Sequence, residues 1–220
     1  MKPDVFGGRI NVGRSMLSGG ETRLKLWLAD RVPGWLGTRQ LTLASVPLSG
    51  ALLACGFMAP SRRGWWLVAA AVIVAQYLTD LVDGEVGRRR RSGLVHWGFY
   101  ADHLLDFVFL SIGLAAYCLG VPTVPLPLSI GFMLIVQTMI VSSFLEFGAT
   151  GVARYKRFGV GPTELRLSMV LVNVALFLFG ADWLALAAPY LVVSFGLLLV
   201  AWVVKGQRLA RRIDEVGWDD

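Results

Sequence analysis

Long apolar runs, separated by short polar segments, dominate the chain after its first 40 residues. A helix needs about 20 apolar residues to cross a bilayer, and six runs reach or approach that length. They lie near residues 41–59, 64–86, 98–119, 128–148, 164–181 and 184–204. Only helices and closed barrels satisfy their backbone hydrogen bonds in lipid. The pattern therefore predicts an all-α integral membrane protein with a bundle of six transmembrane helices.

The segment before the first run has a different pattern. Residues 1–20 lack apolar periodicity, whereas between Glu21 and Val32 leucines and a tryptophan mix with charged side chains. This mixture predicts an N-terminal juxtamembrane amphipathic helix that lies in the membrane interface. The expected organisation is an N-terminal arm with this helix at 1–40, the membrane domain at 41–204 and a C-terminal tail at 205–220.

The composition and the placement of charge support a membrane protein. Hydrophobic residues make up 55% of the chain, and the formal net charge is +6. If the N-terminus is cytoplasmic, 19 of the 21 Lys and Arg residues lie in cytoplasmic segments, and only Arg62 and Arg63 lie outside. This asymmetry follows the positive-inside rule and favours a membrane surface over nucleic acid as the partner of the basic residues. It predicts a multi-pass protein with both ends in the cytoplasm, and the expected location is a bacterial-type cell membrane.

Ionisable residues interrupt the apolar pattern between Asp80 and Asp106, where the second expected span gives way to the third. Charged groups in or beside membrane helices are costly and mark functional sites. Positions i, i+3, i+4, i+7 and i+8 of one helix face hold Asp80, Asp83, Gly84, Gly87 and Arg88. The next span carries Gly98, Asp102 and Asp106, spaced by four. Antiparallel neighbouring helices would bring the four aspartates together at the cytoplasmic side.

Four carboxylates in one cavity repel each other, so the site must take up protons or cations. A divalent cation with oxygen ligands is the simplest solution, and Mg²⁺ or Mn²⁺ suits carboxylate, water and phosphate coordination. The sequence therefore predicts a metal site built from Asp80, Asp83, Asp102 and Asp106. Zn²⁺ would require His or Cys, whereas His103 is expected to point away from Asp102.

The sequence DxxDGxxGR, nine residues, then GxxxDxxxD resembles the signature of the CDP-alcohol phosphotransferase family, also called CDP-alcohol phosphatidyltransferases. That signature reads DxxDGxxAR followed by GxxxDxxxD, and Gly87 in place of the usual alanine is the one departure. The resemblance implies six transmembrane helices with a juxtamembrane helix, and a homodimer. It also implies that a phosphate-linked group passes from a CDP-activated donor to an alcohol with release of CMP.

The resemblance assigns roles to the aspartates. Asp80, Asp83 and Asp102 would hold the divalent metals that bind the donor diphosphate. Asp106 would be the general base for the acceptor hydroxyl and would also touch a second metal. These roles match the chemistry of a carboxylate that removes a proton beside a metal-neutralised diphosphate.

The resemblance also implies a nucleotide site. Gly84 and Gly87 would make room for the cytidine, and Arg88 would pair with a phosphate. The family often carries a TPNxxT-like stretch before the first span, which here reads GTRQLT. Thr42 can be matched to it as a nucleotide contact, but Thr38 and the following arginine stand at its Pro and Asn positions.

Two further basic groups remain. A loop on the same side as the carboxylates carries Arg154, Lys156, Arg157 and Arg166. These residues either orient the protein in the membrane or bind a phosphate on the acceptor, such as glycerol phosphate or inositol phosphate. The arginines at 89–91 are expected to contact anionic lipids.

The leading functional hypothesis is divalent-metal-dependent transfer of a phosphatidyl group from CDP-diacylglycerol to a small polar alcohol, in phospholipid biosynthesis. One alternative uses a CDP-aminoalcohol donor and a lipid acceptor, diacylglycerol, at the same residues. A more distant alternative is a cation or proton transporter lined by the carboxylates. Transport does not need this spacing of glycine, arginine and aspartate, and the identity of the acceptor stays open.

Overall fold

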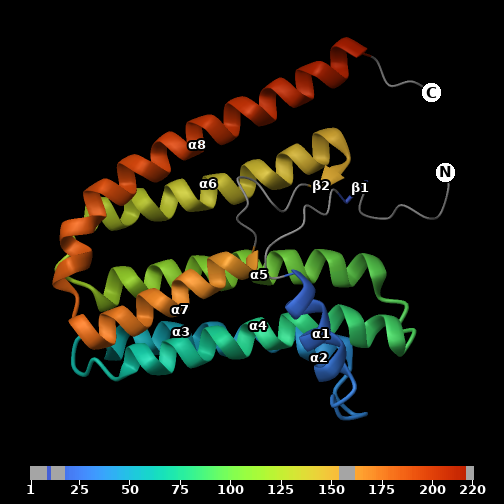
Figure 1. Ribbon diagram of the computed structural model, residues 1–220, viewed down its shortest axis with the longest axis horizontal. Coiled ribbons are helices and arrows are strands. Elements are labelled where there is room, and N and C mark those ends of the chain that lie inside the picture. Colours follow the sequence, from blue (N-terminus) through green and yellow to red (C-terminus); the bar gives the residue numbers. More distant parts are fainter. Residues whose placement is uncertain (1–8, 11–17, 154–161, 217–220) are drawn as a thin grey trace.

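The computed structural model describes residues 9–10, 18–153 and 162–216 of the 220-residue chain. Helices account for nearly all of these residues (Figure 1). In chain order the elements are β1 (Arg9–Ile10), α1 (Ser18–Ala29), α2 (Thr38–Leu43), α3 (Ser45–Met58), α4 (Trp65–Arg89), α5 (Val95–Gly120), α6 (Leu126–Thr150), β2 (Val152–Ala153), α7 (Pro162–Phe179) and α8 (Asp182–Val216). The two-residue strands β1 and β2 pair in parallel.

Five helical segments of the described chain are long and apolar enough to cross a membrane. They are Thr38–Met58, formed by α2 and α3 together, Trp65–Arg89, Val95–Gly120, Leu126–Thr150 and Asp182–Glu215. The all-α membrane class is therefore confirmed, and these segments agree with five of the six expected spans. The helix α7 has 18 residues and coincides with the expected span at 164–181, but it is not among the five, so the six-span count stays a prediction.

The helices run in alternate directions, and the turns after α3, α5 and α7 lie at the same end of the bundle (Figure 1). Gly151 and Gly180, at φ +64° and +79°, follow the last residues of α6 and α7 in the left-handed conformation that ends many helices. The helix α8 instead continues to Val216, so most of the segment expected as a tail from residue 205 is helical.

The main core lies among α3, α4, α5 and α7. Its buried members include Leu52, Trp66, Ile73, Phe109 and Leu176. A Cβ on Gly56 would lie 2.6 Å from the Cα of Ala116, so the backbones of α3 and α5 touch at this glycine. The helices α6 and α8 pack mainly on each other and form a separate layer (Figure 1).

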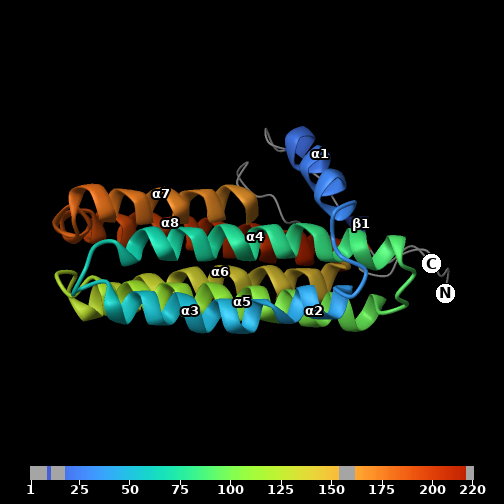
Figure 2. The same ribbon diagram turned by 90° about the horizontal axis from the view of Figure 1, so that it is seen from below.

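The N-terminal helix α1 projects from the bundle beside α4 (Figure 2). It covers most of the segment predicted to be a juxtamembrane helix, whereas its interfacial, amphipathic character stays a prediction. Arg90, after the end of α4, donates hydrogen bonds of 2.7–3.3 Å to the backbone carbonyls of residues 32, 33, 34 and 36. Arg89 forms ion pairs with Asp30 and Glu85. Both arginines thus attach the segment after α1 to α4, and their contact with anionic lipids stays a prediction.

Candidate active site

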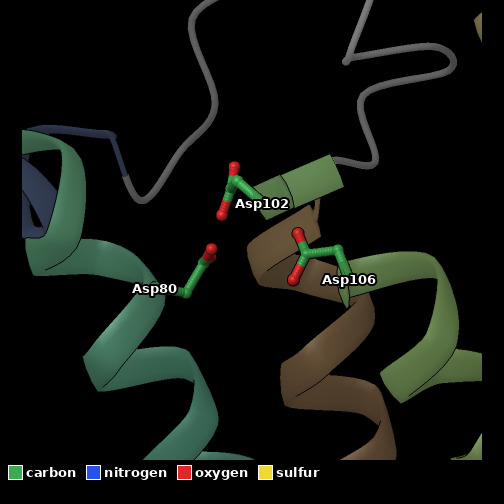
Figure 3. A group of neighbouring side chains, drawn as sticks. All are labelled: Asp80, Asp102 and Asp106. Atoms are coloured by element: carbon green, nitrogen blue, oxygen red, sulfur yellow. The ribbon is translucent and has the colours of Figure 1, made fainter. Parts of the chain in front are cut away.

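Three aspartates from two antiparallel helices converge in the half of the bundle nearer the α4–α5 turn. Asp80 lies on α4, and Asp102 and Asp106 lie one turn apart on α5 (Figure 3). One carboxylate oxygen from each lies within 4.8 Å of the others. The spacing that predicts one shared face on each helix thus corresponds to three carboxylates that point into one volume.

Asp83, the fourth predicted metal ligand, is turned toward α2. Its Oδ2 accepts a hydrogen bond of 2.9 Å from the hydroxyl of Thr42. Its backbone carbonyl accepts a second bond, of 2.5 Å, from the hydroxyl of Thr38. Asp83 is buried, and it is not part of the three-carboxylate group that the described residues form. The predicted nucleotide contact Thr42 therefore holds the Asp83 carboxylate in this structure.

Arg166, near the start of α7, lies between two of the carboxylates. Its Nη1 is 2.7 Å from Oδ2 of Asp80, and its Nη2 is 2.7 Å from Oδ1 of Asp106. The Arg166 side chain is only 14% exposed, so its contacts are shielded from solvent. From the sequence, Arg166 was expected either to orient the protein or to bind the acceptor, together with Arg154, Lys156 and Arg157. These three residues lie outside the described part of the chain.

Gln76 is a site residue that the sequence interpretation missed. It lies one helical turn before Asp80 on α4 and is fully buried. Its side-chain amide nitrogen donates a hydrogen bond of 2.9 Å to Oδ1 of Asp106. The signal that would have revealed it is its i−4 spacing from Asp80, because this extends the polar face of the helix by one turn into the membrane.

The remaining predicted nucleotide residues lie near the end of α4. A Cβ on Gly87 would be 3.0 Å from the hydroxyl oxygen of Thr38, so this glycine makes room for α2. Within the described part of the chain, a Cβ on Gly84 would have only the Arg88 guanidinium nearby, at 3.7 Å. Arg88 is exposed and forms an ion pair of 2.6 Å with Glu85. Gly84 and Arg88 are thus both exposed, on the face that the resemblance assigns to the nucleotide.

His103 lies beside the acidic group. Its Nδ1 is 2.8 Å from the carbonyl oxygen of Phe99 and 3.6 Å from Oδ2 of Asp102. The His103 ring packs on Phe99 and Phe144, and among the described residues His103 is not part of the three-carboxylate group, as expected from its position next to Asp102.

The donor set fits a hard divalent cation. Three carboxylates within 4.8 Å of one another supply the oxygen ligands that Mg²⁺ and Mn²⁺ prefer. The Arg166 guanidinium, bonded to two of these carboxylates, is an independent indication that the group attracts positive charge.

Comparison with known proteins identifies the family of this chain. The family model for CDP-alcohol phosphatidyltransferase matches residues 37–205, which is well over half of the chain. The chain belongs to this family. The resemblance inferred from the aspartate motif is thus confirmed, and the match begins just before α2 and ends within α8. All the residues of this candidate CDP-alcohol phosphatidyltransferase site lie within it.

A relative is the inner membrane protein YnjF of Escherichia coli (strain K12). It is 36% identical to this CDP-alcohol phosphatidyltransferase family member over 98 residues. The aligned segment covers 44% of this chain and 45% of YnjF, so the chain matches less than half the length of that relative. Together with the apolar helices, this similarity supports a multi-pass membrane protein.

Proposed function

We propose that this protein transfers a phosphatidyl group from CDP-diacylglycerol to a small polar alcohol and releases CMP, as a step of phospholipid biosynthesis. The observation that carries the proposal is the group of Asp80, Asp102 and Asp106, within 4.8 Å of one another on the spacing of the family motif. A transporter does not need this spacing, so the match to the family favours the transferase over the transport alternative.

Asp106 is the proposed general base. The acceptor hydroxyl oxygen attacks the phosphorus that carries the diacylglycerol, while its proton passes to the Asp106 carboxylate. The bond between this phosphorus and the bridging oxygen breaks, and CMP leaves with the electron pair. Mg²⁺ or Mn²⁺, held by Asp80, Asp102 and Asp106 and assisted by Asp83, would neutralise the diphosphate and stabilise the departing CMP. The side chains themselves position the reactants and exclude water.

The proposed nucleotide site consists of Gly84, Gly87, Arg88 and Thr42. Arg88 is exposed beside Glu85 and is able to exchange that ion pair for a phosphate. Thr42 acts through Asp83, to which its hydroxyl donates.

The proposed acceptor site includes Arg166 together with Arg154, Lys156 and Arg157. Arg166 supports this assignment because its guanidinium lies against the base Asp106, where the acceptor hydroxyl has to arrive. A guanidinium has five N–H donors, so a phosphorylated acceptor can bind Arg166 while its bond to Asp106 is retained.

The proposed arrangement in the cell has six spans, with α7 as the fifth, and both ends in the cytoplasm of a bacterial-type cell. The arginine-rich α4–α5 turn then faces the cytoplasm, as the positive-inside rule requires. The active site opens to the same side, where CDP-activated lipids and polar acceptors meet. A homodimer is part of the proposal through family membership.

The test is CMP release in detergent micelles that contain CDP-diacylglycerol and Mg²⁺. Radiolabelled serine, glycerol phosphate, inositol phosphate and phosphatidylglycerol would be offered in turn, and CDP-ethanolamine with diacylglycerol would test the alternative donor. We expect CMP and a labelled lipid with one acceptor, and a loss of roughly 10²–10⁴-fold for Asp106→Asn, the range of general-base contributions.

The matched control is Asp182→Asn, the same chemical change at an exposed position at the start of α8. Asp182→Asn is expected to retain wild-type turnover. Equal turnover of Asp106→Asn and Asp182→Asn would disprove the role of the base.

A further inference from the structure

The two oxygens of the Asp106 carboxylate differ in their surroundings. Oδ1 accepts two hydrogen bonds, one of 2.9 Å from the Gln76 amide and one of 2.7 Å from the Arg166 guanidinium. Within residues 9–10, 18–153 and 162–216, Oδ2 accepts none. A carboxylate oxygen has about two lone-pair sites, so the donors from α4 and α7 saturate Oδ1.

Saturation of Oδ1 assigns the chemistry to Oδ2. A base must present a free lone pair to the proton that it removes, within hydrogen-bond reach. Two donors from different helices also fix the rotation of the carboxylate, because a turn about the side-chain torsion would break both bonds. Oδ2 is thereby held in one direction.

Gln76 is the unusual member of this pair of donors. Arg166 already supplies charge to Asp106, whereas Gln76 adds a neutral amide that is 0% exposed inside a membrane helix. Its other amide atom, Oε1, is buried and has no hydrogen-bond partner among the described residues. Burying an amide with an unsatisfied oxygen destabilises a fold. The bond to Asp106 is the one side-chain hydrogen bond that Gln76 forms among the described residues.

We propose that Gln76 is a positioning residue that holds Oδ1 of Asp106 and directs Oδ2 toward the acceptor hydroxyl. Gln76 does not touch substrate and takes no part in proton transfer. The expected change in kcat rests on the proposed function. The geometric content of the inference, a fixed Asp106 carboxylate, is independent of which alcohol is the acceptor.

The test variant is Gln76→Met, which retains the length of the side chain and removes the donor. Groups that orient a catalytic or metal-binding side chain typically contribute 10–100-fold, so we expect kcat to fall by that range while KM for CDP-diacylglycerol is unchanged. An apolar side chain in the bundle core leaves thermal stability in detergent unchanged or higher. A purely structural Gln76 would give the opposite pattern, with altered stability and an unchanged kcat.

The control is Gln137→Met, the same substitution on another membrane helix, α6. In the described structure Gln137 forms no hydrogen bond with the aspartates, and wild-type kcat is expected for this variant. A second experiment introduces Gln76→Met into the Asp106→Asn variant, where no further loss of residual turnover is expected, because Gln76 acts through that carboxylate. A further loss of equal size in the double variant would overturn the proposal, as would a wild-type kcat for Gln76→Met alone.

Binding of Mn²⁺ without substrate separates this inference from the proposed function. If the wild-type protein binds Mn²⁺ but releases no CMP under any condition, the proposed function fails. In that case we measure Mn²⁺ affinity through the signal of the free ion. An affinity about tenfold weaker for Gln76→Met than for the wild-type protein still supports a positioned Asp106. Unchanged Mn²⁺ affinity would then overturn it.

Discussion

Replacing Arg166 by methionine tests whether this arginine is an internal counter-ion of the acidic group. The substitution retains much of the apolar stem and removes the charge between Asp80 and Asp106. Without Arg166 the carboxylates face one another with no cation among the described contacts, so we expect the metal-free protein to be less stable.

The magnitude follows from the geometry. Each contact of 2.7 Å supplies roughly 6 kcal/mol of attraction at an effective dielectric constant of 20, and desolvation of the three charges offsets most of it. Removing one partner of a buried ion pair costs about 3–5 kcal/mol. The Asp106 side chain is 36% exposed and partly screened, so the lower end, about 3 kcal/mol, applies.

The assay is thermal unfolding in detergent with EDTA. For a chain of this length, about 3 kcal/mol corresponds to a fall of roughly 6–12 °C in Tm. Mg²⁺ should reduce the difference in Tm between Arg166→Met and the wild-type protein, because the divalent cation neutralises the carboxylates that have lost their ion pairs with Arg166.

The control is Arg211→Met on α8, which removes an exposed ion pair of 2.8 Å with Glu215. Exposed pairs contribute about 0–1 kcal/mol, so a shift near zero is expected. If Arg166→Met and Arg211→Met unfold at the same temperature in EDTA, Arg166 is not the counter-ion of the acidic group.

Three further predictions concern the surroundings of the site. In a Thr38→Ala background, Gly87→Ala should stabilise the protein by about 1 kcal/mol through helix propensity, measured by thermal unfolding. With the native Thr38, whose hydroxyl lies 3.0 Å from the new Cβ, the same substitution should give no stabilisation or should destabilise the protein. Arg90→Lys should speed limited proteolysis of residues 30–37, because an ammonium lacks the forked guanidinium that reaches four carbonyls. Arg91→Lys loses no side-chain hydrogen bond seen among the described residues, so its rate of proteolysis should equal that of the wild-type protein. EDTA should abolish CMP release and added Mg²⁺ or Mn²⁺ should restore it; turnover that persists in excess EDTA would contradict the metal requirement.

Much of the fold could be predicted because lipid leaves a chain few choices. Apolar runs near the length of a bilayer become helices, and five of the expected runs match the described spans within a few residues at most of their ends. The helical end of α8 could not be predicted from apolar runs. Its last turns carry Lys205 and several arginines, and a charged amphipathic segment has no apolar run to mark it.

Part of the site was also accessible from the sequence. Asp102 and Asp106 share a face because they are four residues apart, and a short turn places them opposite Asp80. The contacts of Arg166 with the aspartates could not be predicted, because Arg166 is 60 residues from Asp106 in sequence and helical phase says nothing about such distant contacts. The role of Arg90 was missed for a related reason, since its partners are backbone carbonyls, which every residue carries.

Gly87 and Thr38, which differ separately from the family pattern, form one structural feature. The Thr38 hydroxyl donates to the backbone carbonyl of Asp83, so it is held 3.0 Å from the position that a Cβ of residue 87 would take. One turn later the Thr42 hydroxyl donates to the carboxylate of the same aspartate. Because both hydroxyls of α2 meet Asp83, the alanine usual in the motif would disturb the contact that holds an expected metal ligand. We therefore expect the exchanges at positions 87 and 38 to be coupled, with alanine at position 87 tolerated better when the hydroxyl at position 38 is absent.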